Sequence, residues 1–215
     1  MNQTVLKYFP TLTDRQVSQF ERIGSLYPEW NDKINVISRR DISNLYPNHI
    51  LHSLAIVKLL DRYGAPVAGT TFLDMGTGGG FPGIPLAIMY PDCQFHLIDR
   101  IGKKIMVARS IAEEIGLTNV SFQHGDIGEC RKKYDFVVSR AVMQLADLIR
   151  LVSKNISRKC LNGIDNGIIC LKGGNLDEEI ENARRPVIDI DITDFFSEPY
   201  FETKKLLYVP MHISK

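Results

Sequence analysis

A run of apolar residues that contains an acid leads into a loop of glycines. The segment from Phe72 to Pro85 reads Phe-Leu-Asp-Met-Gly-Thr-Gly-Gly-Gly-Phe-Pro-Gly-Ile-Pro. Glycines leave the backbone uncovered, so a ligand can lie directly on it. Because open parallel sheets bind ligands beyond the carboxyl ends of their strands, this loop is the first candidate binding site. Its candidate ligand-binding residues are Asp74, Gly76, Gly78, Gly80 and Phe81.

Two ligand classes are compatible with this loop. The glycines at 78, 80 and 83 match the dinucleotide fingerprint, which indicates an NAD(P)-dependent oxidoreductase. However, Pro82 and Pro85 each remove an N–H from the helix start that would face a pyrophosphate. The acid Asp74 would repel phosphates and suits a cation, such as the ammonium and sulfonium of S-adenosylmethionine (SAM). The sequence therefore favours SAM and keeps NAD(P) as the alternative.

Polar groups also follow the next two predicted strands. Asp99 ends the second strand, at the position from which a carboxylate accepts hydrogen bonds from ribose hydroxyls; it could instead cap the helix that follows. The run Asp126-Ile127-Gly128 follows the third strand, where it would contact an adenine or form a simple turn.

The residues after the fourth strand restrict the methyl acceptor. Methyl transfer from a sulfonium is an in-line displacement, for which the protein must mainly hold donor and acceptor close together. The run from Val138 to Ala141 reads Val-Ser-Arg-Ala. It lacks the Asn/Asp-Pro-Pro-aromatic tetrad of exocyclic amine methylation and the cysteine nucleophile of carbon methylation. Acceptors with a free lone pair remain, such as a guanine ring nitrogen.

Arg140 is the candidate catalytic and substrate-binding residue, because a guanidinium can stack on a base or pair with a phosphate. Its alternative is a salt bridge to a nearby carboxylate. Lys172, after the fifth strand, lies at the same edge of the predicted sheet and either reaches RNA or is solvated. Basic clusters on loops and helix starts would form a face for a polyanion, and from them we select Lys103 and Arg40 as further RNA-binding residues. His49 is interpreted as a packed, hydrogen-bonded histidine rather than a catalyst.

The elements that must position these residues alternate along the chain. Apolar residues at helical spacing from Thr13 to about Tyr63 predict an N-terminal helical extension, residues 1–65, followed by a main domain, residues 66–215. Alternating strands and helices in that domain predict a mostly parallel sheet covered on both faces. The predicted parallel strands are Thr71–Asp74, Gln94–Asp99, Asn119–His124, Tyr134–Ser139 and Gly167–Leu171, the helices Gly83–Met89, Lys103–Ile115 and Gln144–Val152, and a final antiparallel pair Val187–Ile192 and Lys205–His212.

Composition sets the remaining expectations. The chain has 215 residues, of which 44% are hydrophobic and 24% charged, as is usual for a globular protein. Its net charge of +1 gives no global field for polyanions, so any RNA affinity must come from a local patch. The four cysteines form no C-x-x-C pair, which argues against a metal site. Without an apolar run of membrane-spanning length or an export signal in Met1–Pro10, we expect a cytoplasmic monomer that does not bind membranes.

Together these motifs resemble the bacterial small-subunit ribosomal RNA guanine-N(7) methyltransferases, also called glucose-inhibited division protein B. The most specific part is the compound run from Asp74 to Ile88, with its prolines; supporting motifs are Trp30-Asn31, Asn35, Arg40-Asp41, His49-Ile50-Leu51 with Ser53, Leu97-Ile98-Asp99 with Gly102-Lys103-Lys104, Ser139-Arg140-Ala141 and Leu171-Lys172-Gly173. The resemblance implies a Rossmann-like class I SAM-dependent methyltransferase fold with a seven-stranded sheet. It also implies SAM as donor and one guanine of 16S ribosomal RNA, alone or in the small subunit, as acceptor. The family's cofactor positions fall on Gly76, Phe81, Ile127, Gly128 and Arg140.

Two departures from the family pattern lie near the expected cofactor. Asp126-Ile127-Gly128 stands where the family usually has Arg, Ala or Val, and Glu, and Arg100 stands where a small polar residue is common. The first change replaces a cation by an anion and deletes a carboxylate. An inactive protein that binds SAM or RNA is therefore a third interpretation.

Overall fold

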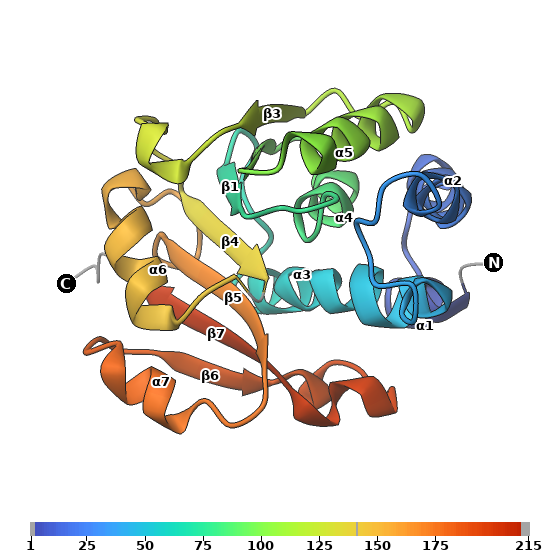
Figure 1. The fold of residues 1–215 in the computed structure, drawn as a ribbon. Coiled ribbons are helices and arrows are strands. Elements are labelled where there is room, and N and C mark those ends of the chain that lie inside the picture. Colours follow the sequence, from blue (N-terminus) through green and yellow to red (C-terminus); the bar gives the residue numbers. More distant parts are fainter. Residues whose placement is uncertain (1–2, 141, 212–215) are drawn as a thin grey trace.

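A seven-stranded sheet with helices on both faces forms the centre of the protein (Figure 1). The computed structural model describes residues 3–140 and 142–211. The strand order is β3-β2-β1-β4-β5-β7-β6, in which β1 to β5 are parallel and β7 is antiparallel to both β5 and β6. The predicted fold class and the final antiparallel pair are confirmed. The strands are β1 (Thr71–Met75), β2 (Gln94–Asp99), β3 (Val120–His124), β4 (Phe136–Arg140), β5 (Gly167–Gly173), β6 (Ile188–Asp191) and β7 (Lys204–Pro210).

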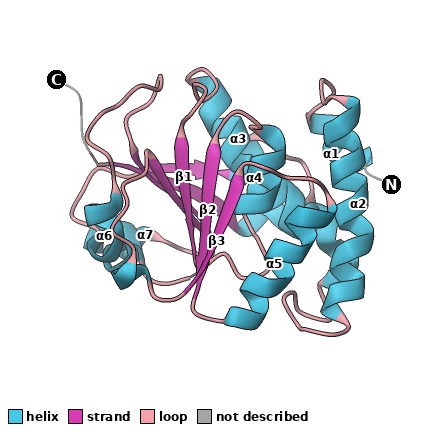
Figure 2. Ribbon diagram, turned by 90° about the horizontal axis from the view of Figure 1, so that it is seen from above, coloured by secondary structure: helices cyan, strands magenta, loops and turns pink. Residues whose placement is uncertain are grey.

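The helices form layers on the two faces of the sheet (Figure 2). One face carries α3, α4 and α5, with α1 and α2 outside them, and the opposite face carries α6 and α7. The helices are α1 (Gln3–Tyr8), α2 (Asp14–Asn31), α3 (His52–Arg62), α4 (Gly83–Met89), α5 (Gly102–Glu114), α6 (Leu145–Val152) and α7 (Asp177–Asn182).

Side chains of the central strands alternate between two buried layers. On the α4 side the Phe72 ring stacks on Phe95 and on Phe136, with centroid distances of 4.8 and 5.3 Å. On the α6 side Leu73 and Val137 belong to the second apolar cluster. Because both faces are covered, these strands are apolar along nearly their whole length, as is typical of parallel sheets. The same alternation turns Asp74 toward α4.

The N-terminal helices pack directly on this framework. At the start of α2, Thr13 and Gln16 form a capping box, in which the Gln16 N–H donates to Thr13 and the Thr13 N–H donates to the Gln16 side chain. Phe20 and Ile23 of α2 and Leu54 of α3 are fully buried in the cluster that also contains Phe72. The division into residues 1–65 and 66–215 stays a prediction, and the apolar cluster is continuous across it.

The structure differs from the predicted elements mainly at their ends. A π-helical turn over Leu45–Leu51 precedes α3, and the six-residue α7 was not predicted because its acidic sequence has no apolar period. The fourth strand extends to Arg140 and the fifth to Gly173, so the candidate residues Arg140 and Lys172 belong to strands. The last strand begins at Lys204, and its predicted final residue His212 lies outside the described residues. Within the described ranges, no helix combines the length and the apolar content needed to cross a membrane.

Candidate functional site

A cavity of about 570 Å³ opens at the carboxyl ends of β1, β2 and β4. This size is typical of small-molecule sites. Four segments that the sequence singled out contribute to its lining, with Gly76, Gly78, Phe81, Asp99, Ile127 and Arg140. Val36, Lys104, Val142 and Met143 also line the cavity, at positions that were not among the predicted cofactor-binding residues.

The loop after β1 needs its glycines for two different reasons. Gly76, Gly78 and Gly80 have positive φ angles of 71°, 57° and 108°, a region that favours glycine. A Cβ at Gly76 would lie 2.7 Å from Val142 Cγ2, and one at Gly79 would lie 2.8 Å from Val36 Cβ. A Cβ at Gly78 would meet nothing within 4 Å. The backbone at Gly78 is therefore open toward the cavity that it lines.

Asp74 holds this loop from behind and does not line the cavity. Its side chain is fully buried, and Oδ2 accepts hydrogen bonds from Thr77 Oγ1 at 2.5 Å and from the Gly83 N–H at 2.7 Å. Burial raises the pKa of Asp74 to about 7, although these two hydrogen bonds and Arg140 oppose the shift. Oδ1 has no hydrogen-bond partner among the described residues. We expected Asp74 to contact the ligand. In the structure it holds the glycine loop instead and does not line the cavity.

The amino terminus of α4 has few donors left for an anion. The Gly83 N–H is bonded to Asp74, and the Ile84 N–H donates to the Gly80 carbonyl. Pro82 and Pro85 have no N–H at all. A pyrophosphate would need these donors free. The helix start is therefore closed to the binding mode of a dinucleotide, as the prolines predicted.

Asp99 joins the ends of β1 and β2 and lines the cavity. Its Oδ2 accepts from the Gly78 N–H at 2.8 Å, and its Oδ1 accepts from the Ile101 N–H at 2.8 Å. The helix α5 starts after Ile101, so Asp99 orders the turn before the helix rather than capping it. Each carboxylate oxygen has a further lone pair. Asp99 can therefore accept hydroxyl groups while it keeps both backbone contacts.

The two departures from the family pattern contact each other. Arg100 and Asp126 form an ion pair, and Asp126 Oδ1 also accepts from the Gly128 N–H at 2.6 Å. The Gly128 N–H is the main cause that lowers the pKa of Asp126. Ile127 lines the cavity, whereas Asp126 and Gly128 do not. Asp126 thus stabilises the turn after β3, and Ile127 in that turn lines the cavity with an apolar side chain.

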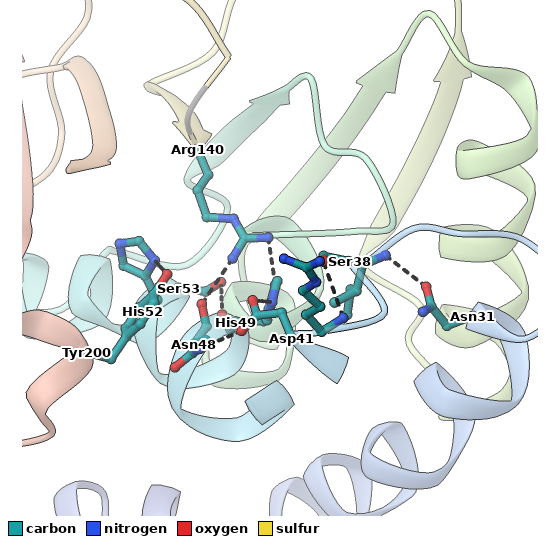
Figure 3. A network of polar contacts seen from close by, with 11 residues as sticks. Asn31, Ser38, Asp41, Asn48, His49, His52, Ser53, Arg140 and Tyr200 are labelled. Atoms are coloured by element: carbon teal, nitrogen blue, oxygen red, sulfur yellow. Dashed lines mark hydrogen bonds and ion pairs between the residues drawn. The ribbon is translucent and has the colours of Figure 1, made fainter. Parts of the chain in front are cut away.

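Arg140 is partly buried at the end of β4, and its guanidinium lies among neutral groups (Figure 3). Its guanidinium donates to the Asn48 carbonyl at 3.3 Å and to His49 Nδ1 at 2.9 Å. It also lies over the ring of Phe81, 5.1 Å from the centroid. Burial lowers the pKa of Arg140, although the group remains charged. The structure shows no direct salt bridge from Arg140 to a described carboxylate, which was the alternative prediction.

The contacts of His49 determine its protonation. Since Nδ1 accepts from Arg140, Nε2 carries the hydrogen and donates to Asp41 Oδ2 at 2.5 Å. Asp41 Oδ1 in turn accepts from Asn48 Nδ2 at 2.6 Å. Burial and the charge of Arg140 lower the pKa of His49 to about 4, which keeps the ring neutral near pH 7. His49 is therefore a hydrogen-bonded, packed histidine that fixes Arg140.

The N-terminal segment also supports the glycine loop, which sequence reasoning did not predict. Tyr27 donates its hydroxyl to the Gly79 carbonyl at 2.8 Å. The side chain of Asn31 accepts from the N–H groups of Val36 and Ile37, and Val36 lines the cavity. The only signals in the sequence were the motifs Trp30-Asn31 and Arg40-Asp41 of the family resemblance.

The predicted RNA-binding cations are not gathered at the cavity. Lys172 donates to the Met143 carbonyl at 2.7 Å and forms an ion pair with Glu179, and these two side chains are only 10% and 11% exposed. The solvated side chain that was one alternative for Lys172 is therefore wrong, and its contact with RNA stays a prediction. Lys103 and Arg40 are exposed and do not line the cavity, whereas Lys104 does.

Comparisons with known proteins agree with this architecture. The family model described as "rRNA small subunit methyltransferase G" matches residues 16–197. A protein of that name from Parabacteroides distasonis is 56% identical over 95% of this chain and 87% of its own length. One from Phocaeicola vulgatus is 51% identical over 96% and 97%. Among solved structures, magnesium protoporphyrin IX methyltransferase from Synechocystis with bound SAM has a TM-score of 0.62 at 16% identity and covers 93% of this chain and 98% of that one, which supports the fold.

The buried Asp74 predicts a pH-dependent stability. Its pKa rises from 3.8 to about 7 on folding, so the folded state binds the proton more tightly than the unfolded state. The wild type should therefore lose free energy of unfolding relative to Asp74→Asn as the pH rises from about 4 to 7, by up to about 4 kcal/mol, with no further change above pH 7. Urea unfolding between pH 4 and 8 measures this difference. The exposed Asp32→Asn should give a flat difference, and a flat difference for Asp74→Asn would contradict the prediction.

The contact between His49 and Arg140 predicts a second effect on stability. His49→Ala removes an acceptor from a buried guanidinium and leaves a void, so it should lower the free energy of unfolding by about 2–4 kcal/mol. Denaturation at pH 7 measures the loss. His124→Ala is the control, because that residue is exposed and its ring forms a hydrogen bond to the Arg100 carbonyl rather than to a buried charge, and it should change stability by less than about 0.5 kcal/mol. Equal effects of the two variants would show that His49 does not hold Arg140.

Proposed function

Because the chain belongs to the rRNA small subunit methyltransferase G family, we propose that it transfers a methyl group from SAM to ring nitrogen 7 of a guanine in 16S ribosomal RNA. The observation that carries this proposal is the cavity beside the glycine loop. It offers a carboxylate and an uncovered backbone to a ligand, while the adjacent helix start is closed to a pyrophosphate. We further propose that the partner is this RNA or the small ribosomal subunit, on which the chain acts as a cytoplasmic monomer.

The residues present fit SAM. Asp99 has the free lone pairs to accept its ribose hydroxyls, and Ile127 gives an apolar surface for its adenine. The open backbone at Gly78 lets a ligand approach closely. Asp74 supports the site through the glycine loop, by accepting hydrogen bonds from Thr77 and the Gly83 N–H. When bound, SAM supplies a methyl group that is activated by the positive charge on sulfur.

The protein's main task in this reaction is positioning. The lone pair of guanine N7 is available without deprotonation, so no general base is required. This agrees with Arg140, whose contacts are neutral acceptors and an aromatic ring. Held by His49 and Asn48, Arg140 keeps its charge and can orient the acceptor base in line with the methyl group. We propose Arg140 as the residue that touches both donor and acceptor.

The other two interpretations have less support. A dinucleotide would lack the free N–H donors that it needs at the start of α4. An inactive protein was suggested by the changes at Arg100 and Asp126, but these residues pair with each other and leave Ile127 facing the cavity. The turn after β3 is therefore still ordered, although Arg100 and Asp126 differ from the family pattern.

Filling the cavity at Gly78 should abolish SAM binding. Gly78→Leu places a side chain in the open space that this glycine borders, and SAM affinity measured by isothermal titration should fall at least about tenfold. Gly64→Leu is the matched control. It has a similar positive φ of 88° and open surroundings, so it carries similar backbone strain, but it does not line the cavity. NAD should bind neither the wild type nor the variants, and tight NAD binding to the wild type would favour the oxidoreductase.

Methyl transfer itself is tested on RNA. A strain that lacks this gene should lose one 7-methylguanosine from its 16S ribosomal RNA, as read by mass spectrometry of RNA fragments. The purified protein should restore that methyl group from labelled SAM. An unchanged modification map would disprove the substrate assignment, and SAM binding without transfer would support the inactive interpretation.

A further inference from the structure

A second cavity adjoins the first at Arg140. Its volume is about 290 Å³, and Arg140 lines both cavities. The walls come from the ends of β4 and β5, the start of β7 and the beginning of α3. This is the same edge of the sheet on which the first cavity opens, because β7 runs antiparallel to β5 and starts where β5 ends. The lining residues are His49, His52, Arg140, Leu171, Lys172, Gly173, Tyr200 and Lys204.

His52 has an unused polar atom at this cavity. The residue is only 4% exposed, and its Nε2 has no hydrogen-bond partner among the described residues. Its Nδ1 lies 3.5 Å from the hydroxyl of Tyr200 (Figure 3). Burial keeps the pKa of His52 well below its usual value, so the ring is neutral. Buried polar atoms nearly always have partners, so the hydrogen bonding of this ring is incomplete in the protein without a ligand.

The charge at this cavity is positive. Lys172 is neutralised by Glu179, but Arg140 contacts neutral groups and Lys204 forms no ion pair with the part of the chain that the structure describes. The ammonium of Lys204 lies 4.9 Å from the centroid of the Tyr200 ring. Cationic donors favour a base edge that carries acceptors. Guanine presents O6 and N7 on one edge, whereas adenine places an amino group beside N7.

We propose that this second cavity receives the acceptor guanine, with Arg140 and Lys204 directed to O6 and with His52 and Tyr200 contacting the remainder of the base. The inference rests on the proposed function and deepens it, because it assigns the acceptor a place in the structure. The base enters from a single-stranded or flipped nucleotide, and its N7 points past the side of Arg140 into the first cavity, in direct line with the methyl donor.

The transfer step is balanced without a proton acceptor. The N7 lone pair forms a bond to the methyl carbon while the bond from that carbon to sulfur breaks. The bonding electrons stay on sulfur, and the positive charge passes to the methylated base. No proton moves, which is consistent with the neutral His52 at the wall.

Kinetics on variants of the cavity test the assignment. Lys204→Met and His52→Leu should each lower kcat/KM for undermethylated small-subunit RNA by about tenfold or more. Their affinity for SAM should stay within about twofold of the wild type, since neither residue lines the first cavity. Lys205→Met is the matched control. It lies next to Lys204 on β7 but pairs with Asp189 and Asp191 and does not line the second cavity, so its kcat/KM should stay near the wild-type value.

A binding measurement covers the case in which His52→Leu does not fold. In wild-type protein saturated with S-adenosylhomocysteine, guanosine monophosphate should shift the ¹⁵N signals of the His52 ring, whereas adenosine monophosphate at equal concentration should not. Shifts caused equally by both nucleotides, or by neither, would overturn the assignment.

Failure of this inference is distinguishable from failure of the proposed function. If the wild type methylates the RNA and Lys204→Met does so equally well, the acceptor lies elsewhere and only this inference is wrong. The inference is also wrong if the variants lose affinity for SAM as much as they lose kcat/KM for RNA. If the wild type transfers no methyl group, the proposed function fails, and the acceptor assignment fails with it.

Discussion

A guanidinium buried at the end of a central strand must find hydrogen-bond acceptors nearby, because an unpaired charge in the interior is costly. In this protein those acceptors come from the residues just before α3, which supply the Asn48 carbonyl and His49 Nδ1. Asp41 then fixes the tautomer of His49. The position of Arg140 therefore depends on a chain segment about ninety residues earlier, and the division of the site into two cavities depends on Arg140.

A buried carboxylate decides which class of donor the first cavity accepts. Asp74 accepts the N–H of Gly83 that a pyrophosphate would otherwise use. The loop therefore does not suit a dinucleotide, although its glycines match the dinucleotide fingerprint. The prolines on either side have the same effect by lacking an N–H. Asp74, Pro82 and Pro85 thus each remove a donor that a pyrophosphate needs. Their agreement explains why this short segment allowed the ligand class to be predicted.

The strands, their order of appearance and the glycine loop were predictable because they depend on local pattern and on general rules for parallel sheets. Asp99 was predicted for the same reason, since it follows a strand at the ligand-binding edge. The partners of buried charges were not predictable. Glu179, which pairs with Lys172, lies in a short acidic helix with no apolar period, and nothing local links it to β5. Asp41 and Asn48 were equally hidden, because their role arises only when α3 packs against β5 and brings them to Arg140.

The continuous apolar cluster under the N-terminal helices has a consequence for biosynthesis. Residues of α2 and α3 are made early, but α2 packs against α4 and α5 and α3 packs against β5, all of which are made later. During that interval the nascent chain carries an amphipathic segment without its sheet, and loop closure over a long sequence separation must precede its burial. The apolar faces of α2 and α3 therefore stay without their full cover until the later helices and strands have been synthesised.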